Sequence, residues 1–213
     1  MHPTINESLH YAMTSLEVLA VLAFACSGLI AGLRKQLDLV GICMVSGATA
    51  FGGGTLRDIL LDRRPFFWME NAYWLWIILF LCVIATIFMK RRHVEFTERA
   101  IQVPDAIGLG LFSVVGAQMA LDLGMPIIVT LLMAVLSAIF GGVLRDMICN
   151  EIPKAFSDHQ PYAIFAFLGS ALLIILQSIG WSEWLSLSLC ALLIALLRIV
   201  AVYQRWELPR WQG

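Results

Sequence analysis

The sequence Phe-Gly-Gly-Gly-Thr-Leu-Arg-Asp at residues 51–58 returns as Phe-Gly-Gly-Val-Leu-Arg-Asp at residues 140–146. Each copy stands near the end of a long apolar segment and places its glycines just before an arginine and an aspartate. Glycine weakens a helix by about 1 kcal/mol relative to alanine, and a charge at the centre of a membrane costs at least about 2.5 kcal/mol. Their repeated combination marks both stretches as the candidate working site.

The composition is that of an integral membrane protein. Of 213 residues, 60% are hydrophobic and 14% charged, and the mean hydropathy is +0.85; soluble domains contain about 25% charged residues. A net charge of -1 provides no field that attracts nucleic acid, so no nucleic-acid partner is expected. The sequence contains no nucleophile with a matched base, phosphate loop or zinc motif, so we expect neither an enzyme nor a bound cofactor.

Charged residues divide the chain into seven segments of roughly 20 apolar residues, the length that crosses a bilayer as a helix. We expect spans at residues 15–33, 39–61, 72–89, 103–121, 126–148, 161–179 and 184–203. The connections are too short for a soluble domain. The expected fold is therefore an all-α integral membrane protein, a single domain over residues 1–213.

Basic residues are distributed unevenly between the two sides of these spans. On one side lie Arg34, Lys35, Lys90, Arg91, Arg92, Arg99, Lys154, Arg205 and Arg210. On the other side lie only Arg63 and Arg64. The positive-inside rule predicts a cytoplasmic C-terminus and an N-terminus outside.

An offset of 88 residues relates the two glycine motifs and extends well beyond them. Without a gap it aligns Phe24 with Phe112, Gly28 with Gly116, Leu33 with Leu121, Ala50 with Ala138, and Arg57-Asp58 with Arg145-Asp146. We infer a duplicated three-helix unit, at residues 15–89 and 103–179, with residues 184–203 as an additional helix. Because each unit has an odd number of spans, the repeats are predicted to be inverted.

A hydroxyl, a glycine and an arginine share one helical face in each unit. They are Thr49, Gly53 and Arg57, and Ser137, Gly141 and Arg145. We expect the helices to break at Gly52, Gly53 and Gly54 and at Gly141 and Gly142, freeing the carbonyls of Gly53, Gly54, Gly141 and Gly142 to coordinate K⁺. The alternative is close helix packing, because small residues recur at four-residue spacing before both motifs.

An arginine inside a membrane needs an acidic partner or water. The candidate partners are Asp58 and Asp146, bound either to the neighbouring arginine or across the interface between the repeats. The acids would raise the local cation concentration, and Arg57 and Arg145 would gate by pairing with them. Two alternatives stay open: Arg57 snorkels to the membrane surface, and acidic residues Glu17 and Asp105 either face the same cavity or cap helix N-termini.

These features resemble the prokaryotic members of the trimeric intracellular cation (TRIC) channel family, whose bacterial domain was formerly labelled a glycine transporter. The resemblance rests on the doubled Gly-Gly-x-x-Arg-Asp motif, the seven spans and the outside N-terminus. It implies a homotrimer in the bacterial inner membrane, with a pore in each subunit lined by the second and fifth spans and conducting K⁺, and possibly Na⁺. The Lys-Glu-Val tripeptide of the animal channels is absent, so their lipid-dependent gating is not carried over.

The leading hypothesis is therefore a passive potassium-permeable channel. The alternative is a secondary transporter of a small zwitterion such as glycine, with Arg57 or Arg145 holding the carboxylate. The basic cluster Lys90, Arg91 and Arg92 is a candidate contact for anionic lipid headgroups.

Overall fold

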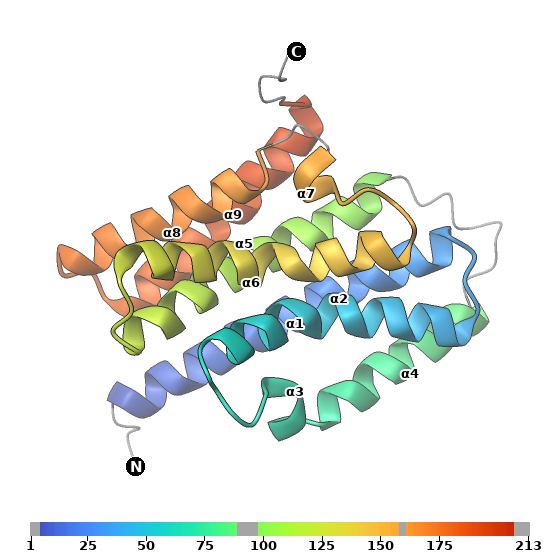
Figure 1. Ribbon diagram of the computed structural model, residues 1–213, viewed down its shortest axis with the longest axis horizontal. Helices are drawn as coiled ribbons and strands as arrows, with labels where there is room; N and C mark the ends of the chain where they lie inside the picture. The colour runs from blue at the N-terminus through green and yellow to red at the C-terminus, as the bar shows by residue number, and fades with distance from the viewer. Residues whose placement is uncertain (1–4, 89–97, 158–160, 207–213) are drawn as a thin grey trace.

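The computed structural model describes residues 5–88, 98–157 and 161–206 of the chain. The described residues form helices and no strands (Figure 1). The helices are α1 (Ile5–Arg34), α2 (Leu39–Leu60), α3 (Phe67–Glu70), α4 (Tyr73–Phe88), α5 (Glu98–Asp122), α6 (Ile127–Ile148), α7 (Lys154–Ser157), α8 (Ala163–Ser178) and α9 (Glu183–Gln204).

Five of these helices, α1, α2, α5, α6 and α9, are long and apolar enough to cross a membrane. The expected third and sixth spans correspond to α4 and α8, which are apolar but have only 16 residues each. A 16-residue helix is about 24 Å long, less than the roughly 30 Å of a bilayer's hydrocarbon core. All-helical membrane architecture is confirmed, whereas the number of spans expected from the sequence is not.

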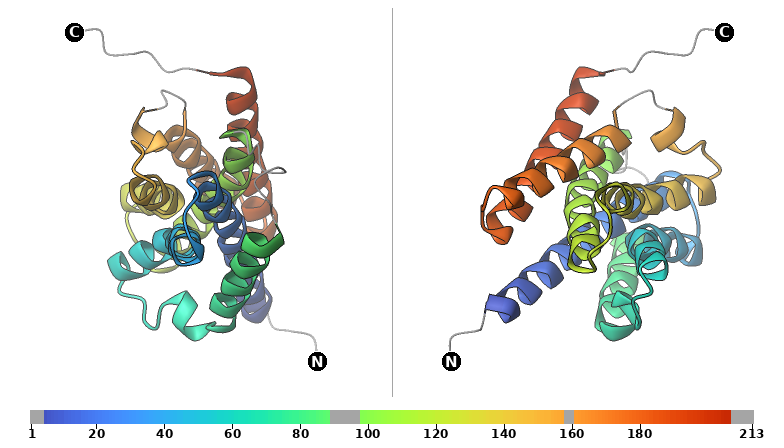
Figure 2. Two further views of the ribbon diagram at one scale, coloured as in Figure 1. Left: turned by 90° about the vertical axis from the view of Figure 1, so that its right-hand side faces the viewer. Right: turned by 60° about the vertical axis from the view of Figure 1, so that its left-hand side comes forward.

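Four helices, α1, α2, α5 and α6, form the centre of the bundle. α1 packs on α2 and α5, and α6 packs on the same two helices. On this centre, α4 packs against α2, while α8 and α9 pack together over α6 and α5. Figures 1 and 2 show α4 and the α8–α9 pair on opposite sides of the four central helices.

The glycines lie where α2 crosses α6, and the expected helix break is wrong. Both helices are α-helical through their glycine runs, which keeps the carbonyls of Gly53 and Gly141 inside helices. A Cβ added to Gly53 would collide with the carbonyl oxygen of Ser137, and one added to Gly141 would collide with that of Thr49. The glycines thus serve the close packing considered as the alternative, because only glycine lets the two backbones approach so closely.

These reciprocal contacts also fix the direction of the crossing. Gly53 lies against residue 137 and Gly141 against residue 49, so the residue numbers run in opposite directions along the two helices. α2 and α6 are therefore antiparallel. Each arginine lies about 9 Å beyond the crossing along its own helix, so Arg57 and Arg145 are separated by about 18 Å.

α1 and α5 cover the crossing with a second set of paired contacts. A Cβ on Gly28 of α1 would lie 2.7 Å from Oγ1 of Thr49, and one on Gly116 of α5 would lie 2.6 Å from Oγ of Ser137. The rings of Phe24 and Phe112 stack with their centroids 5.5 Å apart. The same residue types thus hold both halves of the bundle centre together.

We predict that Gly53→Ala destabilises the protein by about 1 to 3 kcal/mol, the usual range for an overpacked core. The added methyl group must push α2 away from the backbone of Ser137. The matched control is Gly47→Ala in the same helix, because a Cβ at Gly47 meets no atom within 4 Å. Unfolding by sodium dodecyl sulfate in mixed micelles measures both, and equal stability of the two variants would contradict the packing role.

Candidate functional site

The guanidinium of Arg57, in the last turn of α2, lies between two carboxylates. Its Nη2 donates to Oε1 of Glu17 on α1 at 2.5 Å. Its Nε and Nη2 donate to Oδ1 of Asp58 at 2.9 and 2.8 Å. The guanidinium carbon lies 6.0 Å from the centroid of the Phe112 ring. We call Arg57, Asp58 and Glu17 the Arg57 cluster.

Burial of the Arg57 cluster decides between the alternatives left by the sequence. Arg57 has an exposed fraction of 0%, so it does not snorkel. Glu17 lies about three turns inside α1, so it does not cap the helix N-terminus. Of the two partners considered for Asp58, the structure has the neighbouring arginine, Arg57, and not a residue across the interface between the repeats. Nη1 of Arg57 is buried, and among the described residues no acceptor reaches it. No hydrogen bond to these residues offsets the cost of removing this N–H donor from water.

The second arginine, Arg145 in the last turn of α6, has a similar pair of carboxylates. Its Nη1 donates to Oδ1 of Asp105 on α5 at 2.5 Å, and its Nε donates to Oδ1 of Asp146 at 2.9 Å. Its Nη1 also donates to Oγ of Ser27 on α1 at 2.5 Å. In both halves the distant acid precedes its arginine by 40 residues. We call Arg145, Asp146, Asp105 and Ser27 the Arg145 cluster.

The two clusters differ in what covers the second oxygen of each carboxylate. In the Arg145 cluster, Oδ2 of Asp105 accepts from the Tyr162 hydroxyl at 2.5 Å, and Oδ2 of Asp146 accepts from the backbone nitrogen of Lys154 at 3.0 Å. In the Arg57 cluster, no described residue donates to Oε2 of Glu17 or Oδ2 of Asp58. These two oxygens are available to a cation or to water.

A cavity of about 510 Å³ opens at the end of the bundle that holds the Arg57 cluster. The charged residues that line it are Glu17, Asp58, Glu70, Asp122 and Arg63. Four carboxylates against one guanidinium give the cavity a negative field, which concentrates cations in a water-filled space. We call this end the Arg57 end and the opposite end the Arg145 end.

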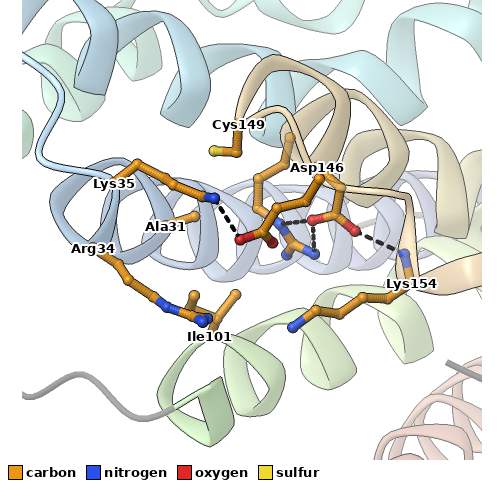
Figure 3. Close-up of a pocket in the computed structure, with 9 residues that line it drawn as sticks. Ala31, Arg34, Lys35, Ile101, Asp146, Cys149 and Lys154 are labelled. Carbon is orange, nitrogen blue, oxygen red and sulfur yellow. Dashed lines mark hydrogen bonds and ion pairs between the residues drawn. The ribbon is translucent and has the colours of Figure 1, made fainter. Parts of the chain in front are cut away.

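The Arg145 end is narrow and more basic. Two cavities of about 10 Å³ each border Arg145, Asp146 and Lys154. Figure 3 shows one of them, where Nζ of Lys35 pairs with Oε1 of Glu151 at 2.7 Å beside Asp146. Partial burial raises the pKa of the Glu151 carboxyl, but the hydrogen bond and charge of Lys35 outweigh it and hold that pKa below its ordinary value of 4.5. The pair is therefore charged at neutral pH.

Three site residues escaped the sequence analysis. Ser27 and Tyr162 bind the Arg145 cluster directly, and the guanidinium carbon of Arg198 on α9 lies 4.8 Å from the centroid of the Tyr162 ring. Arg198 is a third arginine inside an apolar span, which was a signal as strong as that of the other two. Ser27 and Tyr162 carry no such signal, because the 88-residue offset places Val115 and Trp74 opposite them.

The remaining predicted site residues lie in α2 and α6, at the crossing of these helices or directly beside it. The hydroxyls of Thr49 and Ser137 are buried, and each donates to the carbonyl four residues earlier in its own helix at 2.6 Å. Gly52 lies against Leu144, Gly54 lies 3.7 Å from Glu17 and Gly142 lies 3.3 Å from Asp105, as measured from an added Cβ. The lipid contact expected at Lys90, Arg91 and Arg92 lies outside the described residues.

The sequence and the fold of this chain are both similar to those of known proteins. The sequence model of the family described as "Glycine transporter" matches at residues 14–90 and again at residues 102–178. A UPF0126 membrane protein of Deinococcus radiodurans is 33% identical over 207 residues, covering 97% of this chain and 93% of that protein. The crystal structure of the TRIC trimeric intracellular cation channel orthologue from Rhodobacter sphaeroides has a TM-score of 0.83 at 30% identity, covering 91% of this chain and 98% of that one. The chain belongs to the prokaryotic TRIC family.

The TRIC resemblance inferred from the doubled motif is thus confirmed. The UPF0126 inner membrane protein YadS of Escherichia coli is a further relative, 29% identical over 154 residues that cover 72% of this chain and 73% of that protein. These relatives indicate no enzyme family. The name of the TRIC family describes the solved relatives as cation channels, while the name of the sequence model describes a transporter.

We predict that Glu17→Gln lowers the free energy of unfolding of this TRIC-family protein by about 3 kcal/mol, because it removes one carboxylate from a buried guanidinium. The matched control is Glu151→Gln, which removes the same charge from the half-exposed pair with Lys35 and costs at most about 1 kcal/mol. Sodium dodecyl sulfate unfolding in mixed micelles measures the difference. Equal losses in the two variants would contradict the role of Glu17 as the counter-charge of Arg57.

Proposed function

We propose that the protein is a passive, potassium-permeable cation channel, with a pore inside each subunit that runs from the Arg57 end to the Arg145 end. The observation that carries the proposal is the pair of arginine–carboxylate clusters on opposite sides of the α2–α6 crossing. At one end two carboxylate oxygens that have no donor among the described residues belong to side chains lining a cavity of about 510 Å³. The similarity to a solved TRIC cation channel supports the same function.

In this proposal α2 and α6 line the pathway, and their crossing is its narrowest part. Asp58 and Asp146 draw K⁺, and to a lesser extent Na⁺, into the two ends by charge. The hydroxyl groups of Thr49 and Ser137 are buried beside the crossing, on the sides that face α1 and α5. Arg57 and Arg145 control passage, because a guanidinium that binds a carboxylate competes with a passing cation for it.

The architecture that we propose around this pore has seven membrane-crossing helices. The short helices α4 and α8 cross where the bilayer thins or where flanking residues extend the apolar length. Residues 15–89 and 103–179 are inverted repeats, and residues 184–203 are the additional helix. The Rhodobacter relative is described as trimeric and the Escherichia coli relative as an inner membrane protein, which supports a homotrimer in the inner membrane. The N-terminus is outside and the C-terminus is cytoplasmic.

The carrier of a small zwitterion is the less favoured function. The name of the matching sequence model refers to glycine transport, but the solved relatives are described as cation channels. A channel passes ions down their gradient without saturation at low concentration, whereas a carrier shows counterflow. Counterflow of radiolabelled glycine, measured beside K⁺ flux in the same liposomes, therefore separates the two functions.

We predict that Asp58→Asn lowers K⁺ flux into liposomes by about fivefold. A unit negative charge 4 Å from a cation in water attracts it by about 1 kcal/mol, which corresponds to about a fivefold higher local cation concentration. Glu70→Gln, which removes another carboxylate from the same cavity, should lower the flux in the same direction without touching Arg57. Fluorescent potassium indicators inside the liposomes measure the rates.

The matched control is Asp62→Asn, which removes one charge from the same end of α2. Asp62 is exposed and does not line the cavity, and its positive φ of 52° suits asparagine as well as aspartate. Its K⁺ flux should equal that of the unchanged protein. Unchanged flux in both Asp58→Asn and Glu70→Gln, or counterflow of glycine in place of K⁺ flux, would contradict the proposed channel.

A further inference from the structure

The thioether of Met119 on α5 contacts a guanidinium at the wall of the cavity at the Arg57 end. Nη1 of Arg63, in the loop that follows α2, donates to Sδ of Met119 at 2.8 Å. Both residues line the cavity of about 510 Å³, and Met119 is half-buried. A thioether sulfur is a weak hydrogen-bond acceptor, so this contact holds the Arg63 side chain only loosely.

Arg63 is the only basic residue among the described residues that line this cavity. Four carboxylates line the same space, yet none of the described carboxylates forms an ion pair with Arg63. The backbone nitrogen of Arg63 donates to the carbonyl oxygen of Asp58 at 2.8 Å, which fixes the main chain at the end of α2, while the side chain is exposed. The position of this positive charge at the cavity therefore depends on the bond to Met119.

The other repeat has different residues at the equivalent positions. The 88-residue offset aligns Arg63 with Glu151 and Met119 with Ala31, and both of these line a small cavity at the Arg145 end. There Glu151 binds a charged partner, Lys35, at 2.7 Å (Figure 3). Among the hydrogen bonds of the described residues, the one between a guanidinium and a thioether thus belongs to the Arg57 end.

Methionine is the partner in this contact that a peroxide can change. A neutral peroxide enters an acidic cavity without electrostatic repulsion. The sulfur of Met119 attacks one peroxide oxygen and gives up two electrons, the O–O bond breaks, and the departing hydroxide takes the proton of the transferred oxygen and leaves as water. The product is a sulfoxide, which turns an apolar side chain into a polar one. Its oxygen is a stronger acceptor than the sulfur and forms a charge-assisted hydrogen bond with a guanidinium.

We propose that Met119 is a site of reversible oxidation by peroxides, and that its sulfoxide holds the charge of Arg63 in the cavity and lowers cation entry at the Arg57 end. The effect on entry rests on the proposed function, because a positive charge beside the pathway opposes K⁺. The oxidation of Met119 and the tighter hold on Arg63 are measurable without ion flux. Methionine sulfoxide reductases reverse the change and should restore the flux.

The first measurement follows the two side chains by mass spectrometry in protein reconstituted into liposomes. Hydrogen peroxide should oxidise Met119 at least about fivefold faster than Met133, which is 7% exposed and does not line the cavity. Phenylglyoxal, which modifies accessible guanidiniums, should then react with Arg63 about threefold more slowly, because the new hydrogen bond shifts the side chain toward its bound position. The matched control is Arg64, whose guanidinium carbon lies 4.4 Å from the centroid of the Phe66 ring and whose rate should be unchanged.

Potassium flux through the same liposomes tests the consequence for cation entry. Peroxide should lower K⁺ flux by about threefold, less than the roughly fivefold effect of a full unit charge 4 Å from the cation. Met119→Leu should remove this response, whereas Met69→Leu, which replaces an exposed methionine that does not line the cavity, should keep it. Arg63→Gln should also remove the response, and Arg64→Gln should keep it. Met119→Gln, whose amide oxygen replaces the sulfoxide oxygen as acceptor, should lower the flux without peroxide.

The outcomes separate this inference from the proposed function. A slower phenylglyoxal reaction of Arg63 together with lower K⁺ flux supports both. A slower reaction in a protein that carries no cation flux, with or without peroxide, supports the modification site and overturns the channel. Oxidation of Met119 no faster than that of Met133, an unchanged reaction rate at Arg63, or a conducting protein whose flux does not respond to oxidation of Met119 overturns the inference.

Discussion

The guanidinium of Arg57 lies between Glu17 and Asp58, and that of Arg145 lies between Asp105 and Asp146. An unpaired arginine inside an apolar bundle costs several kcal/mol or more, so each needs a carboxylate partner in the packed state. Because each distant acid comes from another helix, the ion pairs fix α1 against α2 and α5 against α6. The close α2–α6 crossing then joins the two pairs.

The same interactions connect the fold to ion passage. Each guanidinium binds only one of the two oxygens of each carboxylate. The second oxygen of that carboxylate is then either covered by another donor or open to a cavity. At the Arg57 end these oxygens adjoin a wide acidic cavity, and at the Arg145 end Tyr162 and the backbone of Lys154 cover them. Two clusters with similar cores thus differ in access, because α9 and the start of α8 contribute to only one of them.

Much of this arrangement was predictable from the sequence, since charge in an apolar segment and an 88-residue offset are visible without coordinates. Arg57, Arg145 and their neighbouring acids were found in this way. The predicted helix break was wrong. Closely spaced glycines are compatible with a break or with a close helix crossing, and only the position of the facing helix's backbone decides between the two. Tyr162 and Ser27 were missed because their roles depend on three-dimensional proximity to Arg145, and the residues opposite them in the other repeat differ in chemistry.

The central claim is that these clusters border a cation pathway within one subunit. Reversal potentials of the purified protein in planar bilayers, under gradients of potassium chloride and then with sodium replacing potassium on one side, test it most directly. We expect a reversal potential near the equilibrium potential of K⁺, with K⁺ carrying more current than Cl⁻. A reversal potential at the chloride value, or no unitary current at any voltage, would contradict it.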